Sequence, residues 1–336
     1  MPDISVVTPT RNRLALLRLT MASVNAQTLT SWEHIIVDDG SDDGTAEEVQ
    51  RLAAADPRIH YMSSSAGGKG ANVCRNMGIE AAQSDLVVLL DSDDLLRPGC
   101  LAQRVEVMRR NADLSFAVFR GGVFRQSPGD MPRLFHDLPP GDDILRFLCG
   151  EYLWQTTGPV WRRSYLRQIG GFDETLLSMQ DVELHVRAIC GGGKYQCFSE
   201  VDYDVRWQFD LEKTSLRHFR DPLYIEAAAR VPEKLRDTLE KAGLLTWSRQ
   251  RALLGLCFGL AENWMRGGHL EQAMRAWNSS CRHYGATWPV RAGGFLMLAL
   301  LRTSDGESTG VGRLANKWKG WVRFRQELEL LNRTSP

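Results

Sequence analysis

The stretch VVLLDSDDLL, residues 87–96, joins a run of apolar strand-forming residues to three carboxylates, Asp91, Asp93 and Asp94. Aspartate is a poor strand former, and like charges about 4 Å apart in a partly buried site repel each other by several kcal/mol. A chain that only needed to leave a sheet has less costly residues available for the turn. We therefore expect a positive charge between these carboxylates.

Strand and helix signals alternate on the amino-terminal side of this stretch. Apolar runs predict strands at residues 4–9, 34–39, 58–63 and 86–90. The helices predicted between them include one capped by Asn12, one that starts with a capping box of Thr45 and Glu48, and one over residues 71–83. This βαβαβαβ order predicts a parallel sheet with right-handed crossovers and helices on both faces.

The ends of these strands are expected to form one ligand-binding rim, because ligands of such sheets bind beyond the carboxyl ends of the strands. The rule brings four segments together: residues 8–11, residues 38–39, the glycine-rich loop 67–72, and residues 91–94. The three carboxylates of the opening stretch are therefore expected where the ligand binds.

Length and composition exclude several classes of protein. The 336 residues exceed the usual size of one core and predict a full domain with an appended part, and 43% hydrophobic residues suffice for globular packing. With 41 basic and 41 acidic residues, the chain has no overall field that would attract nucleic acid. The seven cysteines are scattered without a C-x-x-C pair, which indicates free thiols in a reducing compartment.

The start of the sequence predicts a cytoplasmic protein. MPDISVVTPT lacks the basic and apolar regions of a signal peptide, and no run approaches 18 consecutive apolar residues. No membrane-spanning segment is therefore expected.

Five motifs carry a family resemblance. TPTRNR (8–13), VDDGSDDGT (37–45), GANVCRNMGI (70–79), LLDSDD (89–94) and GGFDETLLSMQDVELHVR (170–187) occur in order. Together they resemble the signature series of family 2 inverting glycosyltransferases with the GT-A fold, over about residues 3–215. The implied fold class is α/β, with a Rossmann-like, mostly parallel central sheet flanked by helices. The implied division is a catalytic domain at 1–215 and a helical C-terminal region at 216–336.

The resemblance implies a nucleotide-sugar donor, expected here to be a UDP-sugar, and a glycan or lipid-linked saccharide as acceptor. Negative charge grows on the donor diphosphate as the glycosidic bond breaks, so a divalent cation held by oxygen ligands is needed. We expect Mn²⁺ or Mg²⁺, with Asp93 and Asp94 as metal ligands and Asp91, Ser92 and Asp93 in contact with the donor. For any single aspartate of the three, capping of the following turn is the alternative.

The resemblance also assigns residues to the nucleoside. Thr8, Pro9 and Thr10 match the loop that lines it, and Asp39 matches a carboxylate that accepts the uracil N3 hydrogen, with turn formation as the alternative. Arg11 stands where the family usually has Tyr or Phe, and its guanidinium plane can also stack on a base.

Two further residues are matched to the donor diphosphate. Arg75 and Asn76 follow the glycine loop at the start of a predicted helix, where backbone amides favour anions. Lys69 in the same loop is interpreted as a solvated surface lysine.

The candidate general base is Asp181, which aligns with the aspartate of the family's Glu-Asp motif. The preceding residue is Gln180, which can keep the hydrogen bond of the glutamate without its charge. Glu183 is the local competitor for the role of base, and its other interpretation is an exposed helix position. Gln208 stands where a histidine often completes the metal site, and Trp207 either lines the acceptor site or is buried.

The last segment with a readable pattern is residues 313–331. One helical face is apolar and lies next to basic residues; it comprises Leu314, Trp318, Trp321, Phe324, Leu328 and Leu331. Two interpretations are open. The segment is either an interfacial membrane helix, which would place the protein at the inner face of the membrane, or it docks against the catalytic domain.

Other classes of function fit the sequence less well. No G-x-G-x-x-G follows the first strand and no Walker loop is present, which disfavours dehydrogenases and P-loop enzymes. A sugar-1-phosphate nucleotidyltransferase needs a loop rich in glycine, arginine and lysine after the first strand, and TPTRNRLALL is not such a loop. A non-catalytic sugar-nucleotide-binding protein would not need both the base and the metal carboxylates.

Overall fold

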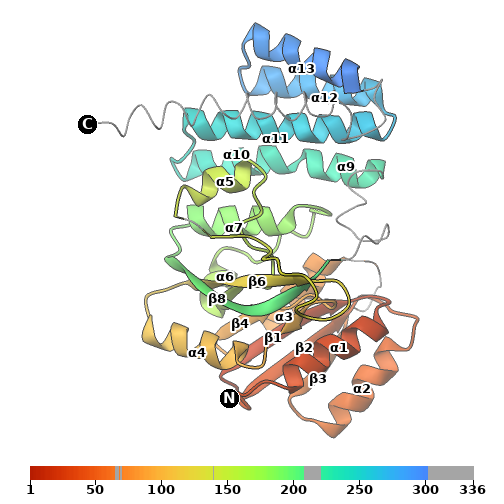
Figure 1. Cartoon of the computed structure of the whole chain (residues 1–336), viewed down its shortest axis with the longest axis vertical. Coiled ribbons are helices and arrows are strands. Elements are labelled where there is room, and N and C mark those ends of the chain that lie inside the picture. The colour runs from red at the N-terminus through yellow and green to blue at the C-terminus, as the bar shows by residue number, and fades with distance from the viewer. Residues whose placement is uncertain (65–67, 69, 139, 208–220, 302–336) are drawn as a thin grey trace. The chain divides into compact units, whose positions relative to one another are not determined.

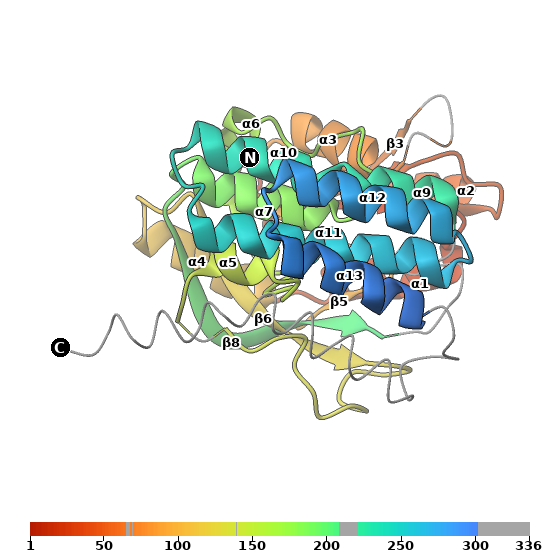
Figure 2. The ribbon, with the colours of Figure 1, turned by 90° about the horizontal axis from the view of Figure 1, so that it is seen from above.

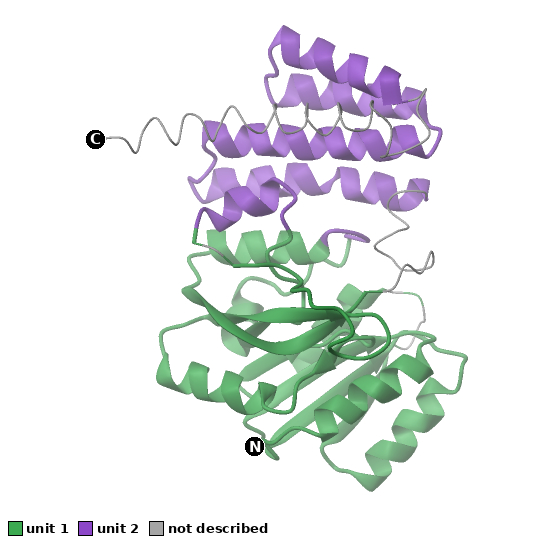
Figure 3. Ribbon diagram, in the orientation of Figure 1, with its two compact units in different colours: residues 1–140, 152–175, 180–208 green, residues 141–151, 176–179, 209–336 purple. Residues whose placement is uncertain are grey.

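The computed structural model describes residues 1–64, 68, 70–138, 140–207 and 221–301. The chain divides into two compact units, which Figure 3 colours separately. The first comprises residues 1–140, 152–175 and 180–208, and the second comprises residues 141–151, 176–179 and 209–336. The expected boundary between residues 215 and 216 lies outside the described residues.

An eight-stranded sheet forms the centre of the first unit (Figure 1). The strands are β1 (Ile4–Thr10), β2 (Trp32–Asp38), β3 (Ile59–Ser63), β4 (Leu86–Leu89), β5 (Leu95–Leu96), β6 (Phe116–Phe124), β7 (Pro159–Arg162) and β8 (Tyr195–Arg206). Their order is β3-β2-β1-β4-β7-β6-β8-β5. The first four strands pair in parallel, as predicted. The sheet as a whole is mixed, because β7 is antiparallel to both β4 and β6.

Helices cover both faces of the parallel half. The helices that precede β6 are α1 (Leu14–Asn25), α2 (Thr45–Ala55), α3 (Ala71–Ala81) and α4 (Cys100–Arg110). On β1, Val6 packs in one cluster with Val105 of α4, while Val7 faces Gly78 of α3 so closely that a Cβ there would lie 2.2 Å from the valine. Successive strand residues point to opposite faces, so β1 is buried at every position.

The predicted caps of α1 and α2 are wrong, because Asp43, in the loop before α2, accepts hydrogen bonds at the start of both helices. The Leu14 N–H donates to the Asp43 carboxylate at 2.9 Å, whereas Asn12 accepts a hydrogen bond from the backbone of the second loop. The second helix has Gly44 as its N-cap, in the left-handed conformation and without a side-chain cap. The Thr45 hydroxyl donates to Asp43 at 2.5 Å instead. Asp43 thus replaces both predicted caps; it is distant in sequence from α1 and adjacent to α2.

Two more helices complete the first unit, α6 (Arg163–Gln168) and α7 (Gln180–Cys190). The second unit is helical, with α5 (Asp143–Leu148), α9 (Pro222–Ala229), α10 (Val231–Lys241), α11 (Trp247–Arg266), α12 (Leu270–His283) and α13 (Trp288–Leu301). Figure 2 shows α11, α12 and α13 side by side. Trp277 is fully buried between them, edge-on to Phe258 at 5.3 Å and close against Gly294. Among the described residues, no helix is long and apolar enough to cross a membrane.

Candidate functional site

The carboxyl ends of β1, β2 and β4 meet at one rim, as the strand rule predicts. Thr10 pairs with Asp38 across β1 and β2, and the Asp39 N–H donates to the Thr10 carbonyl at 2.9 Å. On the other side of β1, the Leu90 N–H donates to the Val7 carbonyl at 2.9 Å. The turn of residues 91–94 therefore begins beside the nucleoside-binding candidates.

The two aspartates that end β2 have different contacts. Asp38 accepts hydrogen bonds from Ser41 and from the Tyr61 hydroxyl, so it forms the turn. Asp39 accepts from the Ser64 hydroxyl and from the backbone N–H of Gly70, both at 2.9 Å. The second aspartate therefore faces the glycine loop, where the sequence expects the donor.

Residues 8–11 differ in how far their side chains reach the rim. The Thr8 hydroxyl bonds to His34 inside the sheet at 2.9 Å, and Pro9 is buried in β1, so these two offer the rim only backbone. Burial lowers the pKa of His34 to about 3, which keeps it neutral. The Thr10 hydroxyl is buried and has no hydrogen-bond partner among the described residues. Arg11 is exposed and lies 3.9 Å from the Asp39 carboxylate.

The positive charge expected beside the carboxylate turn is present as arginine for two of its members. Arg75 of α3 donates to Asp91 at 2.7 Å, and Arg13 donates to Asp93 at 3.1 Å. Ser92 between them is buried. The Nε–H of Arg75 is buried without a partner within the described part of the chain, so it is left to donate to an anionic ligand.

Asp94, the third carboxylate, is buried and hydrogen-bonded through both oxygens. One oxygen accepts the Arg206 backbone N–H at 3.0 Å, and the other accepts from Gln155 at 2.5 Å and from Thr157 at 3.4 Å. Burial, followed by the charges of Asp93 and Asp91, raises the pKa of Asp94 well above its usual value. These contacts suit a carboxylate that shapes the turn better than one that binds a metal ion directly.

Oxygen donors of the type preferred by Mn²⁺ and Mg²⁺ are therefore present at the rim, with Asp93 better placed than Asp94. No group of three or more His, Cys, Asp or Glu residues among the described residues is arranged to hold a metal ion on its own. A cation at this rim would therefore need oxygen ligands from a bound diphosphate in addition to those of the protein.

Strand β8 supplies residues that the sequence reasoning missed. Asp202, Asp204 and Arg206 alternate along it and so point to the same face. The backbone N–H of Arg206 binds the Asp94 carboxylate, and its Nε donates to the Asp93 carbonyl at 3.1 Å. Arg206 thus holds the turn of residues 91–94 from strand β8. The period-two alternation of charge in DYDVR is the signal that could have identified this face.

Asp181 lies half-buried in the first turn of α7. Burial raises the pKa of its carboxyl group, the Val182 N–H and the charge of Arg75 oppose the rise, and the charge of Asp91 adds to it. The charges of the Arg75–Asp91 ion pair therefore act on the candidate base. A carboxylate with a raised pKa is a stronger base than a solvated one.

The neighbours of Asp181 differ from expectation. Glu183 is 4% exposed and is held by Arg187 through two contacts of 2.7 and 2.8 Å, so the exposed interpretation is wrong and the side chain is committed to an ion pair. The Gln180 side-chain oxygen is buried without a hydrogen-bond partner among the described residues. This oxygen therefore accepts no hydrogen bond within that part of the chain.

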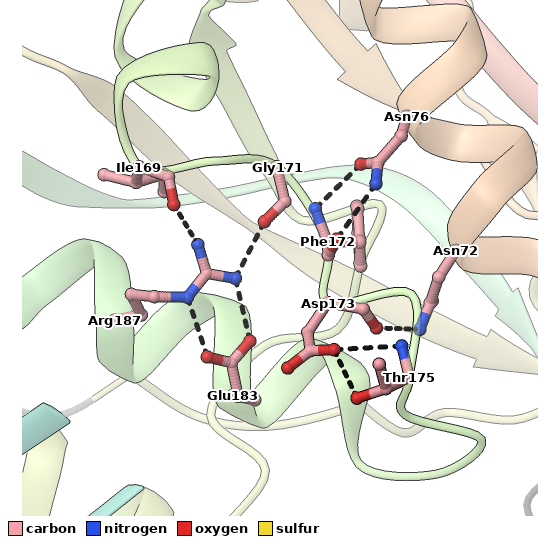
Figure 4. Close-up of polar contacts among 9 residues, drawn as sticks. All are labelled: Asn72, Asn76, Ile169, Gly171, Phe172, Asp173, Thr175, Glu183 and Arg187. Atoms are coloured by element: carbon pink, nitrogen blue, oxygen red, sulfur yellow. Dashed lines mark hydrogen bonds and ion pairs between the residues drawn. The ribbon is translucent and has the colours of Figure 1, made fainter. Parts of the chain in front are cut away.

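Asn76 is next to Arg75 but contacts protein. Its amide exchanges two hydrogen bonds with the backbone of Phe172, at 2.8 and 2.9 Å (Figure 4). Trp207 is half-buried, and the Arg133 guanidinium lies 5.4 Å from its ring centroid. Lys69, Gln208 and residues 313–331 lie outside the described residues.

Part of the chain, including the rim formed by β1, β2 and β4, is similar to a known family. Residues 5–163 match the family model described as Glycosyl transferase family 2. The GalNAc(5)-diNAcBac-PP-undecaprenol beta-1,3-glucosyltransferase of Campylobacter jejuni is 33% identical over 135 residues, which cover 40% of this chain and 42% of that protein. The chain thus spans less than half of this relative's length. The Pre-mycofactocin glycosyltransferase of Mycobacterium tuberculosis is 26% identical over 360 residues, covering 96% of this chain and 72% of that protein.

Solved structures share the fold. TarS 1–349 of S. aureus in complex with UDP-GlcNAc has a TM-score of 0.66 at 17% identity, with 97% of this chain and 92% of that chain covered. The mannosyltransferase PcManGT from Pyrobaculum calidifontis, in complex with GDP-Man and Mn²⁺, has a TM-score of 0.51 at 17% identity and covers 96% of this chain and 85% of that chain. The expected GT-A fold with a helical C-terminal region is confirmed, and residues 5–163 of the chain match the model of glycosyltransferase family 2.

Proposed function

We propose that this protein is an inverting glycosyltransferase that moves a sugar from a nucleotide-sugar donor, a UDP-sugar, to a hydroxyl of a glycan or lipid-linked saccharide. The observation that carries the proposal is the half-buried Asp181, whose raised pKa reflects burial beside the Arg75–Asp91 pair. The UDP-GlcNAc bound to TarS supports the donor class. The undecaprenol-linked saccharide in the name of the Campylobacter relative supports the acceptor class.

Asp181 acts on the acceptor. It takes the proton of the acceptor hydroxyl as that oxygen forms a bond to the anomeric carbon of the donor. The bond between this carbon and the diphosphate oxygen breaks in the same displacement, so the configuration inverts and no covalent enzyme intermediate forms.

The rest of the rim acts on the donor. Asp39 and Thr10 contact the base and the nucleoside, and the buried Nε of Arg75 donates to the departing diphosphate. Asp93 is the carboxylate best placed to hold Mn²⁺ or Mg²⁺, and Asp94 keeps the turn in place from the buried side. When bound, the cation would neutralise the charge that the leaving group gains.

Replacement of Asp181 by asparagine tests the proposal. General-base catalysis supplies about 10² to 10⁴-fold in rate, so Asp181→Asn should lower transfer by about that factor. Donor affinity, measured by calorimetry, should stay near that of the wild type because the lost interaction matters mainly in the transition state. Asp113→Asn is the matched control, since this aspartate is exposed and pairs only with a surface lysine at 3.5 Å.

A panel of sugar nucleotides, with and without Mn²⁺, should accompany these variants. Undiminished transfer by Asp181→Asn would refute the assignment of the base. Release of pyrophosphate from a nucleoside triphosphate and a sugar 1-phosphate would indicate a nucleotidyltransferase, and donor binding without turnover for any acceptor would indicate a binding protein.

A further inference from the structure

A short turn at residues 169–175 leads from α6 toward the helix that carries Asp181. Its two glycines have positive φ values, 86° at Gly170 and 63° at Gly171, which side chains of L residues rarely adopt. A Cβ at Gly171 would also lie 2.5 Å from the Asn76 side-chain oxygen. The path of the turn is therefore narrowly defined, and its position depends on the groups that hold its backbone.

Helix α3 holds the turn from one side. The Asn76 amide accepts the Phe172 N–H at 2.8 Å and donates to the Phe172 carbonyl at 2.9 Å, so it pairs with this residue as a neighbouring strand would. Asn72, one helical turn earlier, donates to the Asp173 carbonyl at 3.0 Å. Between these two asparagines in sequence lies Arg75, which faces the Asp91 carboxylate.

Helix α7 holds the same turn from the other side, as Figure 4 shows. The Arg187 guanidinium donates to the Gly171 carbonyl at 2.7 Å and to the Ile169 carbonyl, while Glu183 binds its remaining edge through both carboxylate oxygens. The guanidinium thus joins the backbone of the turn to α7, and its carboxylate partner stands two residues after Asp181.

Helix α7 carries both the anchoring residues and the candidate base, and it is rigid between them. Glu183 and Arg187 belong to the same two turns of helix as Asp181, so a shift of their anchor shifts the carboxylate of the base as well. Misplacement of a catalytic group by about 1 Å can cost about 10²-fold in rate. Lysine cannot replace the arginine here, since a single ammonium cannot reach two carbonyls and both oxygens of a carboxylate.

We propose that Asn76, Glu183 and Arg187 are positioning residues that clamp the turn of residues 169–175 between α3 and α7 and thereby hold Asp181 where it can take the proton of the acceptor hydroxyl. The inference rests on the proposed role of Asp181 as general base. It assigns to Asn76 a contact with the turn in place of a contact with the diphosphate.

The test compares Arg187→Lys with Arg167→Lys in the full chain. Arg167 is a matched control, because it belongs to the preceding helix and forms an exposed ion pair with Glu80 at 3.0 Å. We expect Arg187→Lys to lower kcat for transfer by about 10 to 10²-fold, with an unchanged dissociation constant for the UDP-sugar, and Arg167→Lys to change neither. Glu183→Gln, which keeps the volume of the side chain, should give a smaller loss of kcat and serves if the lysine variant does not fold.

A double variant separates positioning from general destabilisation. If Arg187 acts through Asp181, then Arg187→Lys should cost nothing further in an Asp181→Asn background, because coupled residues are not additive. The inference is overturned if the two losses multiply, if donor affinity falls with kcat, or if Arg187→Lys lowers only the melting temperature. Undiminished transfer by Asp181→Asn alone would instead refute the proposed base, so the two failures are distinct.

Discussion

Replacing Asp202 by alanine should destabilise the first unit strongly. The carboxylate is buried on β8 and binds Arg104 of α4 through two contacts of 2.7 and 2.8 Å. Arg104 is completely buried, and its guanidinium also donates to the carbonyls of Thr157 and Pro159. In the variant, its charge would remain in the core without a counter-ion.

The magnitude follows from that burial. Removing one partner of a buried ion pair costs about 3 to 5 kcal/mol, because the remaining charge is not solvated. For a domain of about 150 to 250 residues, each kcal/mol lowers the melting temperature by about 2 to 4 °C. We therefore expect the melting temperature, measured by calorimetry, to fall by about 6 to 20 °C. The midpoint of urea unfolding should fall as well.

Asp204, two residues later on the same strand, provides the control. It also binds an arginine through two contacts, 2.9 and 2.8 Å long, but the side chain of Arg97 is 44% exposed and can be solvated by water. Asp204→Ala should therefore cost only about 1 kcal/mol. Equal losses in the two variants would refute the reasoning, because burial of the arginine is the main difference on which it depends. A double variant, Asp202→Ala with Arg104→Met, should recover about 2 kcal/mol or more of the loss, since no charge remains buried.

Two further predictions concern pH and the C-terminal segment. His34 and His185 are buried, and burial lowers the pKa of each from 6.5 to about 3. Below about pH 6.5 the unfolded chain therefore takes up protons that the folded protein does not. As the pH is lowered through this range, the free energy of unfolding should fall by up to about 1.4 kcal/mol per pH unit for each histidine. Urea unfolding at several pH values measures this fall, and a slope that is no smaller in His34→Gln would contradict the assignment. Deleting residues 313–331 should release the protein from anionic vesicles without changing donor hydrolysis if the segment is interfacial, and should lower the melting temperature if it packs against the protein. Vesicle sedimentation and melting curves distinguish the two, and equal vesicle binding by both forms would exclude the membrane interpretation.

Much of the parallel half-sheet could be predicted from local sequence. A strand buried on both faces has an apolar run at its centre, and residues 6–7 of β1 and 35–37 of β2 match that pattern, although polar residues are also buried in both strands. The order of strands and helices along the chain predicts the rim. In the structure, Asp39 and residues 91–94 follow the two strands that pair in parallel with β1. The antiparallel return of β7 was not predicted, because an apolar run does not record the direction of its neighbour.

The caps of α1 and α2 were mispredicted for a different reason. Asn12 and Thr45 each have a sequence that suits a local cap, but the loops before the two helices lie together, and Asp43 serves both helix starts. A local preference of about 1 kcal/mol yields to such tertiary contacts. Glu183 differs from the expected exposed position for another reason: its i, i+4 pairing with Arg187 is a local pattern, but the burial of the pair depends on the segments that pack around it.

The sequence alone determined which residue types gather at the rim, because strand periodicity and strand order are local properties of the chain. It placed three carboxylates after β4 and an aspartate at the start of α7. Only the tertiary structure decided how they differ: Asp91 pairs with Arg75, and Asp94 is buried beneath a backbone amide 112 residues away. The pKa of Asp181 is likewise raised by burial, which no neighbouring residue encodes. The physical reason is that desolvation and hydrogen bonding depend on what surrounds a group in space, and those surroundings exist only once distant segments have packed together.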